Sequence, residues 1–285
     1  MNFTPQDLVQ YLKAASGAIP LDESGIYLVS EEDGDLLEKH WTGIEIADQV
    51  FIASDVRENT PAVYLLDKDE RCVFCVDNDS ILRCHRYDSV EKEWEEVSLS
   101  GNQDIIVHPS SRLSGGIFAS GRIVFFQDPS GQLQGIQVQT DGRWEALPKI
   151  PDHCQQGGAH SIVVSDDNVL HILYIHQDNY IHHLINNPKT GKWNDSTLPG
   201  SGFEGDQVTN FLVIPDDNLT FEICALSSAE KLIRIDKEGV RTELGGLDQG
   251  RFVATSSGEC VIETMRLLKK GIKAVTGTKS KPRRK

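Results

Sequence analysis

The feature that most constrains this chain is a sequence phrase that returns about every fifty residues. Its clearest copy, residues 121–148, has a β-branched and aromatic run, a turn with Asp, Pro and Gly, an alternating run, and a second turn before a tryptophan. Further copies lie at 71–99, 171–199 and, more faintly, 220–244, and residues 25–38 match the first half. One position of the phrase holds Trp94, Trp144 and Trp193, 50 and 49 residues apart, and Arg241 takes it 48 residues later. Such a period is typical of a β-propeller.

Each later copy is preceded by one more apolar run, which makes four strands per unit. These leading runs are 48–66, 113–120, 159–164 and 208–214. The first unit has no such run, whereas the C-terminus offers a spare one at 251–256 and another at 259–265. We therefore predict an all-β fold, a five-bladed β-propeller of four-stranded antiparallel blades, closed by pairing of 251–256 with a strand near 25–30. A six-bladed ring is the alternative if the two termini build one blade jointly.

The N-terminus predicts a short helix. Thr4, Pro5 and Asp7 read as its cap, its first residue and an acid in its first turn, and the helix would run to about Ala15. We expect it to pack across one end of the β body, with binding of a partner as the alternative. The predicted organisation is thus an N-terminal helix and lead-in (1–20), one propeller domain closed by the C-terminal strand (21–265), and a disordered basic tail (266–285).

Charge is divided unevenly along the chain. Residues 266–285 hold nine of the 28 basic residues and no acid, so the rest of the chain carries 19 basic against 43 acidic residues. An acidic body repels phosphates, and we expect no nucleic-acid binding along it. No run of 18 apolar residues and no signal-peptide pattern occurs, so we expect no transmembrane segment and a cytoplasmic location. The basic tail could instead direct the chain to the nucleus, contact an anionic surface, or serve only solubility. The oligomeric state is left open.

The repeated phrase resembles the blade of the fungal fucose-specific lectins of the Aleuria aurantia type. Residues 122–128 match the second-strand phrase that begins with arginine in those lectins, and 141–144 match the Asp-Gly turn that leads to a tryptophan. Residues 71–77 match as well. The resemblance covers about residues 25–260 and implies the propeller scaffold.

The resemblance also implies where a sugar would bind. In those lectins the sugar lies in clefts between neighbouring blades, where an arginine and a third-strand glutamate bind hydroxyl groups and aromatic rings pack on its apolar face. Counting 13 residues forward, Arg71 reaches Cys84 and Arg122 reaches Gly135. His171 takes the arginine position of the next copy, with His183 as its counterpart, and Glu38 lies opposite Gly25 in the first. Since no single repeat keeps both halves of the clamp, we expect free fucose to bind weakly or not at all.

A cluster of histidines at 171, 176, 182 and 183 is the other candidate site. Neutral imidazoles there could bind hydroxyl groups, a metal ion or a proton in transit, and ordinary surface histidines at strand ends are the alternative. The recurrent tryptophans are either packing anchors of the outer strands or stacking platforms for a ligand. The ligand-binding candidates are Glu38, Arg71, Trp94, Arg122, Trp144, His171, Tyr174, His182, His183 and Trp193.

The remaining motifs give little support for a catalytic function, but they do not exclude one. Cys72 and Cys75 are three residues apart on a strand and point to opposite faces, so they cannot share a metal ion. No phosphate loop, serine nucleophile or paired metal-ligand motif occurs, and we expect neither cofactor nor metal. We favour a non-catalytic module that binds a small ligand or glycan. The alternatives are a cofactor-free cyclase or Diels–Alderase of the fungal natural-product kind, which would need an apolar central pocket, and an intracellular interaction scaffold.

Overall fold

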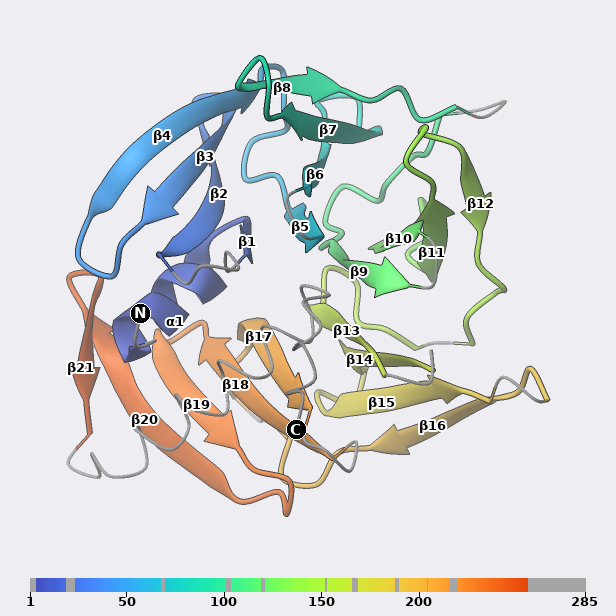
Figure 1. Ribbon diagram of the computed structural model, residues 1–285. Coiled ribbons are helices and arrows are strands. Elements are labelled where there is room, and N and C mark those ends of the chain that lie inside the picture. Colours follow the sequence, from blue (N-terminus) through green and yellow to red (C-terminus); the bar gives the residue numbers. More distant parts are fainter. Residues whose placement is uncertain are drawn as a thin grey trace, which may run out of the picture.

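Five antiparallel sheets stand around a common axis like the blades of a propeller (Figure 1). The computed structural model describes residues 4–18, 24–67, 70–100, 104–118, 121–151, 153–165, 169–187, 190–203, 205–215 and 220–255. Within each sheet the strands follow one another in chain order. The predicted five-bladed architecture is confirmed. No helix in these ranges is long and apolar enough to cross a bilayer.

The secondary structure comprises one helix, α1 (Pro5–Lys13), and the strands of five blades. Blade 1 holds β1 (Ser16–Ala18), β2 (Ile26–Glu32), β3 (Asp35–Trp41) and β4 (Ile46–Ala53). Blade 2 holds β5 (Ala62–Asp67), β6 (Glu70–Val76), β7 (Leu82–Asp88) and β8 (Glu93–Glu96). Blade 3 holds β9 (Ser114–Phe118), β10 (Gly121–Gln127), β11 (Leu133–Val138) and β12 (Trp144–Ala146). Blade 4 holds β13 (His160–Val164), β14 (Leu170–Ile175), β15 (Ile181–Asn186) and β16 (Trp193–Thr197). Blade 5 holds β17 (Val208–Pro215), β18 (Phe221–Ser227), β19 (Lys231–Ile235), β20 (Arg241–Asp248) and β21 (Arg251–Ala254).

The second strand of each repeat is apolar on both faces because it lies between two neighbouring blades. All seven residues of β10 are buried, whereas three of the four residues of β8 at the rim are exposed. Between β10 and β11 the Asp128 carboxylate closes the turn by accepting hydrogen bonds from the backbone N–H groups of Ser130 and Gln132, at 2.8 and 3.1 Å. Gly131 in this turn has a φ of +84°, which favours glycine. The phrase that repeats in the sequence is therefore this strand, its turn and the two strands that follow.

The hydrophobic core is divided among the interfaces between blades. Four clusters join blade 1 to 2, 2 to 3, 3 to 4 and 4 to 5, each built from the facing sides of adjacent sheets. The recurrent tryptophans pack at the edges of these clusters: Trp94 against the first, Trp144 against the second and Trp193 against the third. Their interpretation as packing anchors of the outer strands agrees with this placement.

The fifth interface, between blades 5 and 1, is filled by helix α1. Leu8, Val9 and Leu12 are buried and pack against side chains of both blades, among them Leu28 of blade 1 and Leu212 of blade 5. Figure 1 shows the helix between β2 and β17. The predicted helix is confirmed. It was expected to pack across one end of the β body, but it lies as a wedge between blades 5 and 1.

Polar contacts hold the helix at both of its ends. Thr4 and Asp7 form a capping box, and the buried Asp7 also accepts a hydrogen bond from Trp41 Nε1 of blade 1 at 2.7 Å. At the other end, Asn210 of blade 5 donates to the Leu12 carbonyl at 3.2 Å. The helix is therefore bonded to the first and the last blade at once.

The predicted closure by the C-terminus is wrong. Blade 1 has its own leading strand, β1, which pairs with β2 with Ala18 opposite Tyr27. The C-terminal strand β21 pairs with β20, with Phe252 opposite Leu247, and becomes a fifth strand at the rim of blade 5. Residues 16–18 follow the helix directly. The N-terminal segment therefore supplies both the leading strand β1 of blade 1 and the helix that fills the interface between blades 5 and 1. Residues 259–265 and the tail 266–285 lie outside the described residues.

Candidate functional site

The interface between blades 1 and 2 holds an arginine–glutamate pair. Arg71 lies near the start of β6, and Glu38 lies in the middle of β3 on the facing side of blade 1. Arg71 Nη1 donates to both carboxylate oxygens of Glu38, each at 2.8 Å. The Tyr64 hydroxyl donates to the same carboxylate. Glu38 is 2% exposed, so the pair is removed from water apart from one edge of Arg71. The arginine and the glutamate, which lie in different repeats of the sequence, therefore meet across the interface between blades 1 and 2.

Aromatic rings surround this ion pair. The Arg71 guanidinium carbon lies 3.4 Å from the ring centroid of Tyr87, 5.2 Å from that of Tyr27 and 5.7 Å from that of Trp94. These distances are those of cation–π contacts. Tyr87 and Trp94 are opposite each other on β7 and β8, so the sheet register brings them together. Tyr64 meets Trp94 edge-on with 6.1 Å between centroids.

The local electrostatics keep both groups that donate to Glu38 protonated, the Arg71 guanidinium and the Tyr64 hydroxyl. Burial alone would lower the pKa of Arg71, but Glu38 and the two neighbouring tyrosines outweigh it and raise that pKa. Burial, and then the charge of Glu38, raise the pKa of Tyr64 well above its usual 10.0. Both hydrogen bonds to Glu38 come from Nη1, and a further side-chain hydrogen bond links Arg71 to Tyr64. The indole N–H of Trp94 is buried and has no acceptor among the described residues.

The cleft between blades 2 and 3 repeats part of this arrangement. Arg122 Nη2 lies 2.5 Å from a carboxylate oxygen of Glu70 in blade 2. Trp144 shares its row of the sheet, since Arg122 pairs with Val138 and Val138 with Trp144. The Trp144 indole N–H, like that of Trp94, is buried without an acceptor in the described ranges. Arg122 is 7% exposed, so less of it can reach a ligand than of Arg71.

Blade 4 does not continue the series. Trp193 pairs with Asn186, whereas His171 pairs with the preceding residue, Ile185. His171 is therefore displaced by one residue from the arginine row and points toward blade 5, because successive side chains of a strand alternate between its faces. The prediction that His171 and His183 are the counterparts of the lectin clamp is wrong.

The same two histidines nevertheless meet, as the sequence suggested. His171 Nδ1 and His183 Nε2 are 2.9 Å apart, and both rings contact Phe221 of blade 5. Burial, and then His171, lower the pKa of His183 to about 4, so this ring is neutral near pH 7. The predicted candidate Tyr174 is not beside this pair, since it lies on the opposite face of blade 4 with His182.

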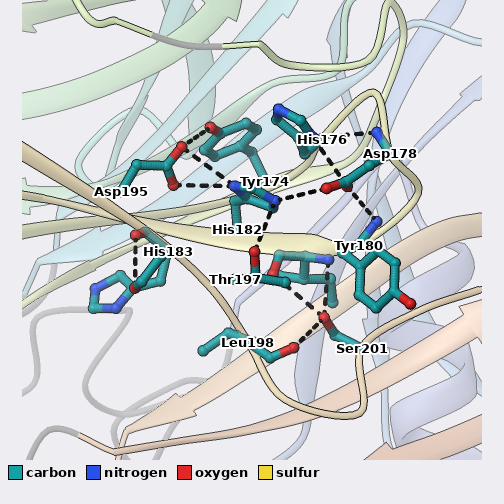
Figure 2. A network of polar contacts seen from close by, with 12 residues as sticks. Tyr174, His176, Asp178, Tyr180, His182, His183, Asp195, Thr197, Leu198 and Ser201 are labelled. Atoms are coloured by element: carbon teal, nitrogen blue, oxygen red, sulfur yellow. Dashed lines mark hydrogen bonds and ion pairs between the residues drawn. The ribbon is translucent and has the colours of Figure 1, made fainter.

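That opposite face carries a polar network, which Figure 2 shows. His182 Nδ1 lies 3.2 Å from each oxygen of Asp195, and its Nε2 lies 3.2 Å from Asp178 Oδ2. Tyr174 donates its hydroxyl hydrogen to Asp195 at 3.0 Å. The rings of His176 and His182 are stacked with 4.0 Å between their centroids. The sequence analysis missed both aspartates, although His176, Asp178 and His182 lie within seven residues of one another.

The structure also forms a pocket of about 180 Å³ between blades 4 and 5. Its wall is mostly polar, and none of the predicted ligand-binding residues belongs to it; it includes Gln155, Gln156, Asn179, Phe203, Asp206 and Gln207. A wall of amides and a carboxylate does not supply the apolar cavity that the cyclase hypothesis requires. The predicted candidates are therefore spread over four places: the interface of blades 1 and 2, that of blades 2 and 3, and the two faces of blade 4.

The fold defines a five-bladed β-propeller. No protein-family model and no curated protein sequence matches the chain. Among solved structures it is similar to AofleA from Arthrobotrys oligospora (14% identity over 84% of this chain and 74% of that one, TM-score 0.64). It is also similar to the fucose-specific lectin from Aleuria aurantia (18% identity, 81% and 77% covered, TM-score 0.59), which is described as a six-bladed propeller. The resemblance seen in the sequence thus holds for the fold, with five blades here.

Proposed function

We propose that this protein is a non-catalytic carbohydrate-binding propeller and that its site is the cleft between blades 1 and 2. The observation that carries the proposal is the Arg71–Glu38 pair with its surrounding aromatic rings. A guanidinium and a carboxylate can bracket neighbouring hydroxyl groups, and a flat ring can pack on the C–H face of a sugar. The similarity to a fucose-specific lectin supports the same class of ligand.

The donors that remain in this cleft determine how a glycan would bind. The exposed part of the Arg71 guanidinium would donate to hydroxyl oxygens while Nη1 stays with Glu38. The indole N–H of Trp94 would gain an acceptor, which explains a buried donor that otherwise lacks one. Because the ion pair is already formed, a monosaccharide such as fucose adds few contacts, and we expect weak binding of about 1 mM, equivalent to about 4 kcal/mol. A larger glycan that also covers Tyr87 would bind more tightly.

A glycan array followed by calorimetry on the best ligand tests this function. Arg71→Lys keeps the charge beside Glu38 but removes the planar fork, and Trp94→Phe keeps the ring but removes the indole N–H. Each should weaken binding at least about tenfold, the effect of about 1.4 kcal/mol. Arg86→Lys on β7, whose side chain is 41% exposed, is the matched control and should bind as the unmodified chain does. No response to any glycan, or a response that both cleft variants retain, would contradict the proposal.

A further inference from the structure

The polar face of blade 4 contains three side chains arranged as metal ligands (Figure 2). The turn after β14 supplies His176 and Asp178, and β15 supplies His182. One ligand atom from each of the three lies within 4.8 Å of the others. This cluster belongs to a different blade from the proposed glycan site and is independent of it.

Both ring nitrogens of His182 face carboxylates. Its Nδ1 faces the carboxylate of Asp195 and its Nε2 faces that of Asp178, each at 3.2 Å. A neutral imidazole has one N–H, so it can donate to only one of these carboxylates and turns a lone pair toward the other. His176 Nδ1 also lies 2.9 Å from the second oxygen of Asp178. Two imidazoles and two carboxylates gathered here are stabilised by a positive charge placed between them.

We propose that blade 4 binds a zinc ion through one nitrogen of His176, the carboxylate of Asp178 and Nε2 of His182. Imidazole and carboxylate are ordinary zinc ligands, and three protein ligands leave a fourth position for water. Nδ1 of His176 and Nε2 of His182 lie 2.9 and 3.2 Å from the two different oxygens of Asp178, and one ligand atom from each of the three residues lies within 4.8 Å of the others. Asp178 is 44% exposed, so the fourth position opens to solvent.

A supporting carboxylate orients the ring of His182. Asp195 accepts a hydrogen bond from the Nδ1–H group of His182, so the lone pair of Nε2 points toward the site. The Tyr174 hydroxyl donates to Asp195 and holds that carboxylate in place. Ligating histidines in proteins generally have such a partner on their second nitrogen. Thr197 Oγ1, 3.2 Å from Nε2, would turn away from the ring to admit the ion.

The turn that carries the other two ligands differs from its counterparts in blades 2 and 3. There an aspartate closes the turn: Asp77 accepts from the N–H of Asp79 at 3.0 Å, and Asp128 accepts from that of Ser130 at 2.8 Å. In blade 4 the Nδ1 atom of His176 accepts the corresponding bond from Asp178 at 3.1 Å. The imidazole thus replaces a capping carboxylate: an ion bound through Nε2 of His176 would leave this bond in place, whereas an ion bound through Nδ1 would displace it.

One local movement accompanies binding. The rings of His176 and His182 are nearly parallel, at 12°, so their lone pairs point in parallel rather than converging directions. One ring must turn about its Cβ–Cγ bond to reach the ion. His176 is the ring to turn, because its side chain is 19% exposed against 11% for His182.

Titration of the EDTA-treated full-length chain with zinc chloride, followed by calorimetry, tests the proposal. We expect one ion per chain, and a visible absorption spectrum typical of four-coordinate cobalt when cobalt(II) replaces zinc. The double variant His176→Gln/Asp178→Asn, confined to the turn and therefore compatible with folding, should lose saturable binding. Asp195→Asn should weaken it about 10- to 100-fold.

The matched control is Asp128→Asn, which alters the equivalent turn of blade 3 and should leave zinc binding unchanged. Circular dichroism of each variant confirms that it is folded. Absence of saturable zinc uptake would overturn the proposal. Uptake that persists undiminished in the turn double variant would overturn it as well, because the ion would then lie elsewhere.

Discussion

The two flanks of blade 1 are built from different chemistry. Toward blade 5 the contact is an apolar wedge, with Leu8, Val9 and Leu12 of the helix almost fully buried. Toward blade 2 the centre of the contact is ionic and aromatic, with Arg71 held by Glu38 and covered by tyrosines. Blade 1 thus closes the ring on one side and presents a buried carboxylate to the arginine and tyrosine of blade 2 on the other.

The difference shows how one repeat can serve two purposes. Apolar burial is non-directional and tolerates a helix in place of a sheet, so it suits a joint between the first and last blades. An ion pair in a cleft is directional and keeps donors that can exchange partners with a ligand. We therefore assign closure to the first flank and recognition to the second.

Removing the helix should have the largest effect on stability. A chain that begins at Ala14 loses three buried apolar side chains worth about 2 kcal/mol each and exposes their partners, which approaches the whole stability of a typical domain. We expect an unfolded or aggregated product, seen by circular dichroism and size exclusion. Within the intact helix, Leu8→Ala should cost about 3 kcal/mol in urea unfolding. Lys13→Ala, which removes only a surface pair with Glu230, should cost less than about 1 kcal/mol.

Breaking the ionic flank should cost less than losing the wedge. Arg71→Ala leaves Glu38 buried without its cation, and we expect a loss of about 3 kcal/mol in the free energy of unfolding. The double variant Arg71→Met/Glu38→Gln removes both charges and should recover most of this loss. Urea unfolding of the four chains in a double-mutant cycle measures the coupling. A loss below about 1 kcal/mol for Arg71→Ala would mean that water already solvates the pair.

The sequence predicted the repeated strands but not what lies between the blades. Its period and turns reflect local backbone preferences, so the five sheets and the helix followed from them. Contacts between blades join residues of different repeats, as Arg71 and Glu38 show, and no spacing within one repeat reveals them. Tyr27 and Tyr64, which contact Arg71 and Glu38 across the interface, were missed for the same reason.

The register of the strands in blade 4 was the second feature that the sequence did not reveal. The connection before β16 is one residue longer than the one before β12, so Trp193 keeps its alignment with Trp144 while His171 faces the other side of the blade. The closure was mispredicted because Ser16–Ala18 is too short to show alternation, although three residues suffice once the helix next to them is buried. Short strands are set by their neighbours more than by their own composition.

The stability of a polar interface between blades should also depend on pH, whereas that of an apolar interface should not. At the joint of blades 3 and 4, His160 is buried, and burial lowers its pKa to about 4, below the usual 6.5. The unfolded chain therefore binds a proton more readily, so stability is complete above pH 6.5 and falls as the pH decreases toward 4.

Between pH 7 and pH 5 this histidine should cost about 2 kcal/mol of unfolding free energy. His160→Gln should reduce that dependence, with Ser114 and the Arg112 carbonyl as the groups that the new amide meets. Hydrogen exchange at pH 5 should show faster opening of β13 than of helix α1. Equal acceleration of both would remove the contrast between polar and apolar joints.

The smallest of these effects should come from the C-terminal strand, which the sequence cast as the closing element. Two chains, one ending at Thr255 and one at Asp248, differ only by the turn, β21 and Thr255. Their difference removes four paired residues at the rim, the partly buried Phe252, and the bond from its N–H to Gln6 at 2.7 Å. Edge pairing of this kind leaves the ring intact, and we expect a loss of about 1–2 kcal/mol, within the range of ordinary substitutions. If the chain ending at Asp248 failed to fold while the longer one folded, β21 would share the closing role that we assign to the helix.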